Sequence, residues 1–170
     1  TPRMPRATAS LAAAIAIFLP LGRPLLVGLT PAVGIGAGLL TTHAARAQNA
    51  LSFYESGLEK FNSGDDRGAI ADFSKVIELN PQSRSGYYAR GMSKANLGKY
   101  KVAINDYTKA LRIDPNFVAA FIARSEAKMK LGNPHGSIKD LDAAIELDSK
   151  NSFAYRVRGI QRETLADLEG

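Results

Sequence analysis

Hydrophobic residues beyond position 47 recur at steps of three and four, in stretches broken by short polar turns. This spacing is typical of amphipathic α-helices that bury one face. Residues 84–113, for example, are predicted to form two helices, at about 84–97 and 100–113. Gly98 lies in the turn between them, where the end of a helix favours a positive φ. The second helix is predicted to end just before Pro115, because the residue before a proline disfavours helical backbone. The pattern therefore predicts helical hairpins.

The hairpin pattern repeats every 34 residues, from about Ala50 to Leu168. Particular residue types return at this interval: an aromatic residue, a small residue, a turn glycine, an alanine and a proline. The main aligned positions are Phe53, Tyr87, Phe121 and Tyr155; Gly57, Gly91, Ser125 and Gly159; Gly64, Gly98, Gly132 and Ala166; Ala69, Ala103 and Ser137; Phe73, Tyr107 and Leu141; Pro81, Pro115 and Ser149. Such self-similarity at a fixed period is the sequence signature of a repeat architecture.

In these positions the chain resembles the tetratricopeptide repeat family, whose units carry aromatic, Leu-Gly, Tyr, Ala, Phe and Pro residues over 34 positions. The resemblance implies an all-α fold, an α-solenoid of helical hairpins over residues 48–170. Repeats are expected at about 50–83, 84–117 and 118–151, followed by a capping helix at 152–168. Stacking is required because one unit cannot bury its apolar side alone. The last helix is interpreted either as a cap with a polar outer side or as the start of a truncated fourth repeat.

Small residues in the repeat predict where the two helices of a unit cross closely. The first helix carries Gly57, Gly91, Ser125 or Gly159, and the second carries Ala69, Ala103 or Ser137. A bulky replacement such as Gly91→Leu is expected to cost about 1–3 kcal/mol by overpacking.

The chain departs from the family beside the small residue of the first helix, where the family has Leu. These positions hold Ser56, Arg90, Arg124 and Arg158, and Asp72, Asp106 and Asp140 recur at the same period. One hypothesis is a ladder of Arg–Asp pairs that links first helices to second helices; for Arg90 the partner would be Asp72 or Asp106. The alternative is two separate solvated stripes. Exposed pairs of this kind contribute only about 0–1 kcal/mol each.

Residues 1–47 differ in kind from the rest of the chain. They contain four Arg and no acidic residue, and two apolar runs lie at 11–19 and 25–40. Ala45 and Ala47 form an A-x-A pattern, which predicts a signal peptide cleaved after Ala47 and a periplasmic or secreted protein. The alternative is an uncleaved anchor in the inner membrane, although the second run has 16 residues and a span needs about 20. N-terminal sequencing distinguishes them, since a mature protein beginning at Gln48 indicates cleavage.

Composition excludes several classes of function. The net charge of +6 falls to +2 beyond residue 47, where 18 basic residues face 16 acidic ones. A balanced charge offers no clustered basic face, so no nucleic-acid partner is expected. The absence of Cys excludes disulfides and thiolate metal sites. His135, the one His beyond the leader, is interpreted as a turn or cap residue. No catalytic, metal or cofactor motif follows the leader, and the prediction is a non-enzyme.

The resemblance implies that the first helices line a concave groove. Its expected lining is apolar and aromatic, which favours an extended peptide or an amphipathic helix of a partner protein. The alternative is that these side chains complete the packing between repeats. The predicted groove residues are Leu51, Tyr54, Leu58, Tyr88, Met92, Ile122, Glu126, Phe153, Arg156 and Ile160.

One binding mode of the family can be tested position by position. Family members that clamp the acidic C-terminus of chaperones use Lys, Asn and Arg at positions matched here by Tyr54, Leu58, Ala89, Ala119 and Ala123. None of these side chains supplies the required donor, so this clamp is not expected. The function predicted is a non-catalytic, exported scaffold for protein–protein interaction. The alternative is a membrane-tethered or self-assembling module, accessory to an enzyme or envelope complex, with copies stacked through the last helix.

Overall fold

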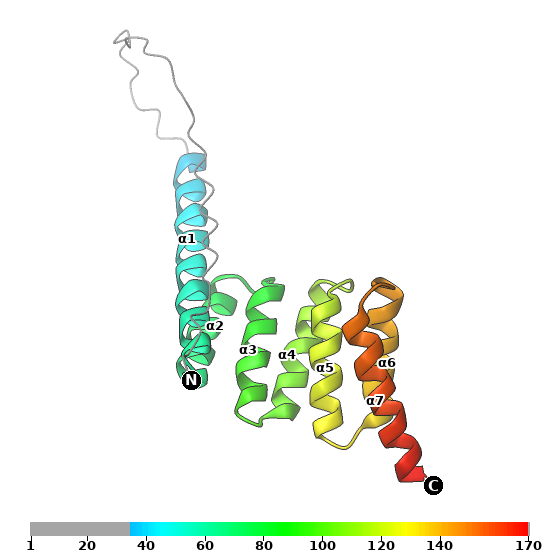
Figure 1. Cartoon of the computed structure of the whole chain (residues 1–170). Helices are drawn as coiled ribbons and strands as arrows, with labels where there is room; N and C mark the ends of the chain where they lie inside the picture. The colour runs from blue at the N-terminus through cyan, green and yellow to red at the C-terminus, as the bar shows by residue number, and fades with distance from the viewer. Residues whose placement is uncertain (1–34, 170) are drawn as a thin grey trace, which may run out of the picture. The chain divides into compact units, whose positions relative to one another are not determined.

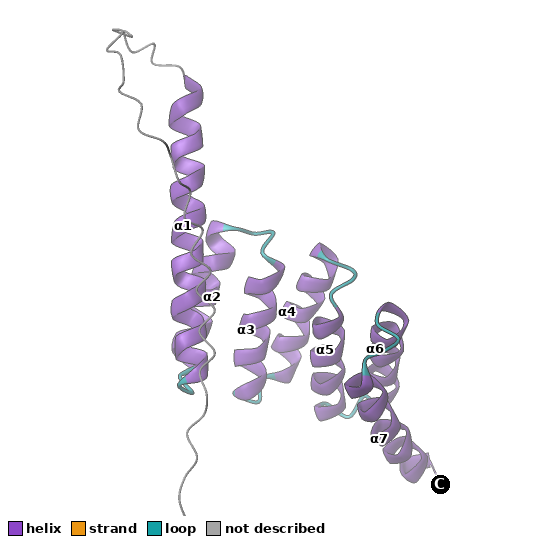
Figure 2. Cartoon of the chain, turned by 45° about the horizontal axis from the view of Figure 1, so that its top comes forward, coloured by secondary structure: helices purple, strands orange, loops and turns teal. Residues whose placement is uncertain are grey.

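The computed structural model describes residues 35–169, and the predictions made for residues 1–34 lie outside this range. All regular structure in the described part is helical, and no strand occurs there (Figure 2). Each helix contacts the next along the chain, so that the helices follow one another in a row (Figure 1). The helices are α1 (Ile35–Asn62), α2 (Asp66–Leu79), α3 (Arg84–Asn96), α4 (Tyr100–Ile113), α5 (Val118–Lys130), α6 (Pro134–Leu147) and α7 (Ser152–Glu169).

Local signals place the helix ends where the sequence predicts them. α3 and α4 match the predicted ranges to within one residue. The turn glycines Gly64, Gly98 and Gly132 have φ values of 85°, 71° and 72°, in the region that side chains with a Cβ avoid. Side-chain caps begin four of the described helices, because Asp65, Ser83, Asn133 and Asn151 each accept a hydrogen bond from the backbone N–H three residues later.

The core lies where first and second helices cross. Phe73 and Leu141 are fully buried and Tyr107 is almost so, at the 34-residue spacing on α2, α6 and α4. A Cβ added to Gly91 would lie 2.6 Å from Cε1 of Tyr107, and one added to Gly57 would lie 2.6 Å from the same atom of Phe73. The predicted close crossing of the helices is therefore confirmed in the first two repeats.

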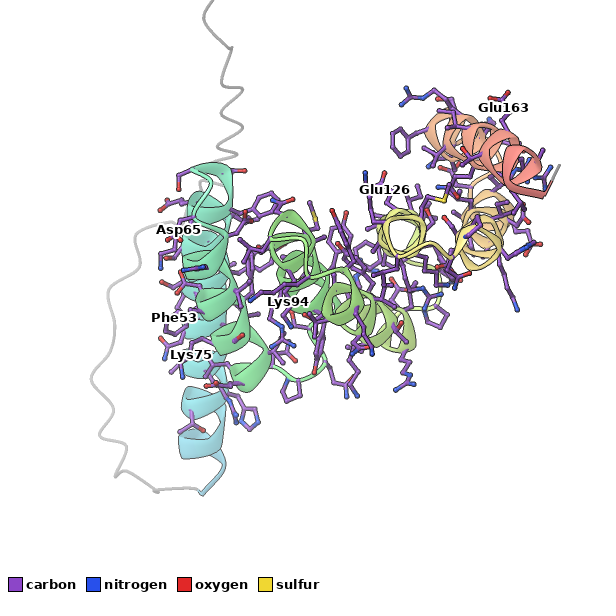
Figure 3. All side chains as sticks on the ribbon, turned by 90° about the horizontal axis from the view of Figure 1, so that it is seen from below. Phe53, Asp65, Lys75, Lys94, Glu126 and Glu163 are labelled. Atoms are coloured by element: carbon purple, nitrogen blue, oxygen red, sulfur yellow. The ribbon has the colours of Figure 1, made fainter. Side chains whose placement is uncertain are left out.

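The Arg–Asp pairs of the predicted ladder are present within the second and third repeats. Arg90 donates from Nε and Nη2 to the two carboxylate oxygens of Asp106, at 2.9 and 2.8 Å, and Lys94 lies 2.7 Å from the same carboxylate. Figure 3 shows Lys94 on the α4 side of α3. In the third repeat Arg124, Lys128 and Asp140 repeat this arrangement.

These ion pairs are not exposed. The side chains of Asp106 and Asp140 are only 8% and 5% accessible to solvent. The premise of exposed pairs worth about 0–1 kcal/mol is therefore wrong for these two repeats. Asp106 and Asp140 lie on the buried faces of α4 and α6, which pack against the first helices of their repeats. The arginines and lysines of those first helices cover the two carboxylates.

The same arginines also join neighbouring repeats. Nη1 of Arg90 donates to Ser74 Oγ at 3.2 Å, and Nη1 of Arg124 donates to Thr108 Oγ1 at 3.0 Å. Nη1 of Arg158 reaches Asp142 Oδ1 at 2.6 Å in the equivalent way. Each guanidinium therefore binds the second helix of the preceding repeat, and two of the three also bind the second helix of their own.

The first repeat uses a lysine and a serine in place of the arginine. Lys60 Nζ and Ser56 Oγ each donate to Oδ2 of Asp72 at 2.6 Å. Burial alone would raise the pKa of Asp72, but the hydrogen bonds from Lys60 and Ser56 and the charge of Lys60 together lower it. A carboxyl whose folded pKa lies below its unfolded value of about 3.9 stabilises the fold above that pH.

We expect Asp72→Asn to flatten the acid side of the stability profile. In the wild type the contribution of Asp72 is lost as pH falls through its lowered folded pKa, and Asn has no such titration. Urea unfolding measured from about pH 6 to about pH 3 should therefore show a smaller drop in the free energy of unfolding for the variant. Equal drops for both proteins would contradict a stabilising role for this pair.

Helix α1 runs through the predicted cleavage position without a break. Ala45 and Ala47 lie inside Ile35–Asn62, and residues 42–49 are exposed. The Arg46 guanidinium donates to the carbonyl oxygen of Glu78 at 3.3 Å. Cleavage after Ala47 stays a prediction. Among the helices described here, none is both long enough and apolar enough to cross a bilayer.

Candidate functional site

A hollow of about 330 Å³ lies among three consecutive first helices, α3, α5 and α7. Tyr88 and Met92 line it from α3, Ile122 and Glu126 from α5, and Phe153 from α7. The structure thus brings together five of the predicted groove residues.

A smaller hollow of about 80 Å³ continues toward the N-terminus. It is lined by the predicted residues Tyr54 and Leu58 of α1, and it shares Tyr88 and Met92 with the first hollow. We call these two hollows together the groove. Leu51, with Tyr54, lines a separate hollow between α1 and the start of α3.

Two predicted residues of α7 lie outside the groove lining. Ile160 is 56% exposed, and the guanidinium of Arg156 lies over the ring of Phe153, 5.1 Å from its centroid. Neither residue lines the hollow that Phe153 helps to form.

Ala95, Asn96, Tyr107 and Ala123 also line the larger hollow, and they were not predicted as groove residues from the sequence. Tyr107 belongs to the second helix α4, whereas the predicted groove residues all lie on first helices. Because Gly91 has no side chain, the Tyr107 ring reaches across α3 and packs at 5.9 Å from the ring of Tyr88. The recurrence of Gly opposite an aromatic residue was visible in the sequence, but its consequence for the groove was not.

The groove contains little charge. Glu126 is the one acidic residue that lines the larger hollow, and no basic residue lines it. Figure 3 labels Glu126 on α5. Burial raises the pKa of Glu126, with Lys130 opposing the shift. Burial also raises the pKa of Tyr88 and of Tyr107, so both phenols stay neutral and can donate hydrogen bonds.

Metal ligation finds no support in the described residues. No group of three or more His, Asp or Glu side chains there is placed to hold a metal ion. His135 lies in the first turn of α6, and Asn133 caps that helix. What the groove can do is bind apolar side chains and offer a few hydrogen bonds.

Comparison with known proteins agrees with this architecture. A family model described as "Tetratricopeptide repeat" matches residues 85–117, which include α3 and α4. No curated protein matches the chain.

Among solved structures, three similar ones are tetratricopeptide domains. The first such domain of Spaghetti (RPAP3), bound to the HSP90 peptide SRMEEVD, is 25% identical, with 70% of this chain and 94% of that chain covered and a TM-score of 0.68. The first domain of human RPAP3 is 25% identical, with 71% and 95% covered and a TM-score of 0.69. The TPR2B domain of yeast Sti1, in complex with pHsp70, is 29% identical, with 68% and 92% covered and a TM-score of 0.61.

The repeat period, the helical hairpins and these matches define a helical repeat protein of the interaction-module class. Residues 85–117 match the tetratricopeptide repeat model, and the described helices share the fold of solved tetratricopeptide domains. Domains of this family are generally non-catalytic.

Proposed function

We propose that the chain is a non-catalytic scaffold that binds a peptide or an amphipathic helix of a partner protein in the groove. The observation that carries the proposal is the apolar lining contributed by consecutive first helices, with Tyr88, Met92, Ile122 and Phe153 around one hollow. An exposed apolar concavity of this kind marks an interaction site. The peptide-bound states of the Spaghetti and Sti1 domains support a peptide as the type of ligand.

The chemistry of the groove favours a different peptide from the acidic SRMEEVD. Ala119 and Ala123 line the groove where a clamp for a carboxylate would place basic side chains, and Ala89 is buried. The charge that the lining does carry is Glu126, which repels an acidic tail. The ligand is therefore expected to present apolar side chains to the groove and to keep acidic residues away from α5.

A matched pair of double variants tests the groove. Met92→Ala with Phe153→Ala removes two apolar lining residues, while Val102→Ala with Leu147→Ala removes two exposed apolar residues from the second helices α4 and α6. Peptides are selected on the wild-type chain from a random phage-displayed library, and their affinities are measured by fluorescence anisotropy. We expect the groove variant to bind them at least about tenfold more weakly and the control variant to bind them as the wild type does.

The peptide SRMEEVD serves as a second arm, with no saturable binding expected. Equal affinity of the selected peptides for wild type and groove variant would overturn the assignment of the site. Tight binding of SRMEEVD would overturn the proposed ligand chemistry while leaving a peptide-binding function in place.

We propose in addition that the scaffold meets its partner outside the cytoplasm. The support for export is the apolar, arginine-flanked leader with its A-x-A pattern at Ala45 and Ala47.

A further inference from the structure

Helix α7 has the side chains with which the first helices hold a second helix. Its sequence keeps the aromatic residue, the arginine, the glycine and the basic residue in register with α3. The matching pairs are Tyr155 with Tyr87, Arg158 with Arg90, Gly159 with Gly91, and Arg162 with Lys94.

In α3 each of these positions meets a partner on α4. Gly91 accommodates the ring of Tyr107, and Arg90 and Lys94 together hold the buried carboxylate of Asp106. The arginine also stacks on the aromatic residue three positions before it, with Arg90 5.6 Å from the ring centre of Tyr87.

On α7 the positions of Tyr155 and Gly159 are exposed. A Cβ added at Gly159 would meet no atom within 4 Å, and Tyr155 is 43% exposed. Arg158 uses Nη1 for Asp142 and stacks on Tyr155 at 5.1 Å, as its counterparts do. Within the described residues no carboxylate accepts from its Nε and Nη2, which are the atoms that Arg90 uses to hold Asp106.

The basic residue one turn later is open as well. The side chain of Arg162 is 58% exposed and lies 3.7 Å from Asp142, which it shares with Arg158. Lys94 and Lys128 instead approach the aspartate of their own repeat to 2.7 Å. The face of α7 therefore presents two guanidinium groups to one partly exposed carboxylate, an excess of positive charge.

Helix α7 does not end at the position where the other first helices end. Ala166 stands where the turn glycines Gly98 and Gly132 have positive φ, and α7 continues past it to Glu169. Within residues 35–169, this face of α7 therefore has no turn at the repeat spacing and no atom near Gly159.

We propose that the face of α7 formed by Tyr155, Arg158, Gly159 and Arg162 docks one amphipathic helix of a partner protein, which supplies an Asp followed directly by an aromatic residue or Leu. The chemistry of this helix is read from the chain's own second helices. They carry Asp72–Phe73, Asp106–Tyr107 and Asp140–Leu141, with a small residue three positions before each Asp. The Asp binds between the two arginines, and the following side chain fills the space over Gly159.

A second copy of this chain is not the expected donor. Asp72, Asp106 and Asp140 already pair with basic residues of their own repeats, and all three are buried. One of these aspartates could bind another molecule only if the two helices of its own repeat separated. The docking surface is also distinct from the groove, whose contribution from α7 is Phe153.

The probe is a fluorescent synthetic peptide of residues 100–113, which contains Asp106 and Tyr107. A lactam between Lys101 and Asn105→Glu, one turn apart on the exposed side of α4, holds it helical. Binding to the full chain is measured by anisotropy, and backbone amide shifts in NMR spectra locate the site. The matched control peptide carries Asp106→Asn and Tyr107→Ala.

The variants that test the surface leave the fold intact. Gly159→Leu fills a space that no atom occupies, and Arg162→Glu reverses an exposed charge. Arg67→Glu, an exposed charge reversal on α2, serves as the control, and circular dichroism checks each protein. We expect saturable binding with shifts along residues 155–162. Gly159→Leu, Arg162→Glu and the control peptide should each weaken it at least about tenfold, and Arg67→Glu should not change it.

Three results would overturn the proposal. The first is no saturable binding of the locked peptide up to about 1 mM, the weak end of measurable affinity. The second is binding whose shifts lie on α3 and α5, or whose affinity is the same for Gly159→Leu. The third is a dimer of the free chain that Gly159→Leu dissociates, which would show that a second copy occupies this face.

Discussion

Gly91→Leu is expected to lower the free energy of unfolding by about 3 kcal/mol or more, at the upper end of overpacking effects. The first added atom already lies 2.6 Å from Cε1 and 2.8 Å from Cδ1 of Tyr107, and the rest of the Leu side chain has no space at this crossing. Tyr107 is nearly fully buried and packs on Tyr88, so its ring cannot move aside without opening the core and the groove wall.

The equivalent change at Gly159 provides the control, and its expected sign is opposite. No atom lies within 4 Å of a Cβ at Gly159, so Leu there should raise the free energy of unfolding by about 0.5–1 kcal/mol through helix propensity. Urea unfolding followed by circular dichroism measures both variants. A loss of less than about 1 kcal/mol for Gly91→Leu would contradict the close crossing of α3 and α4.

Asp106→Ala is expected to lower the free energy of unfolding by about 3–5 kcal/mol, because it leaves buried charge without a partner. Arg90 and Lys94 both bind this carboxylate, and each of their side chains is only 19% exposed. Two cations would then lie side by side in a poorly solvated position. The change would also release the guanidinium that holds Ser74 of the preceding repeat, so that the interface between repeats weakens as well.

The control for this change is an ion pair at the surface. Glu78 pairs with Lys75 at 2.8 Å, with the two side chains 62% and 55% exposed, so Glu78→Ala should change the free energy of unfolding by less than about 1 kcal/mol. Asp106→Asn keeps a hydrogen-bond acceptor and should fall between the two. Equal effects of Asp106→Ala and Glu78→Ala in urea unfolding would show that burial adds nothing to the ladder.

Part of the groove lining was predicted from the resemblance to the repeat family, which implies that the first helices face the groove. The family's groove-facing positions correspond to Tyr88 and Met92 of α3 and to Ile122 and Glu126 of α5, and each pair lies one turn apart on the same side of its helix. Tyr107 was missed because it reaches the groove from a second helix, across Gly91. Such an approach depends on the distance between two helices, which spacing along one helix does not contain.

The Arg–Asp ladder was also predicted from the sequence only in part. Its period was evident in the sequence, but Arg90 had Asp72 and Asp106 as candidate partners at comparable separations along the chain. In the fold Arg90 pairs with Asp106, and its remaining nitrogen reaches Ser74 in place of Asp72. The burial of Asp106, which makes the pair important for stability, was likewise not visible before the helices were packed.

Helix class, turn positions and the 34-residue repeat could be derived from the amino acids alone, because caps, glycine φ values and amphipathic spacing act over a few neighbouring residues. The pairing of Arg90, the ring of Tyr107 in the groove and the open space over Gly159 emerged only from the packed helices. These features depend on distances between side chains far apart in the chain, and such distances are set by how whole helices cross.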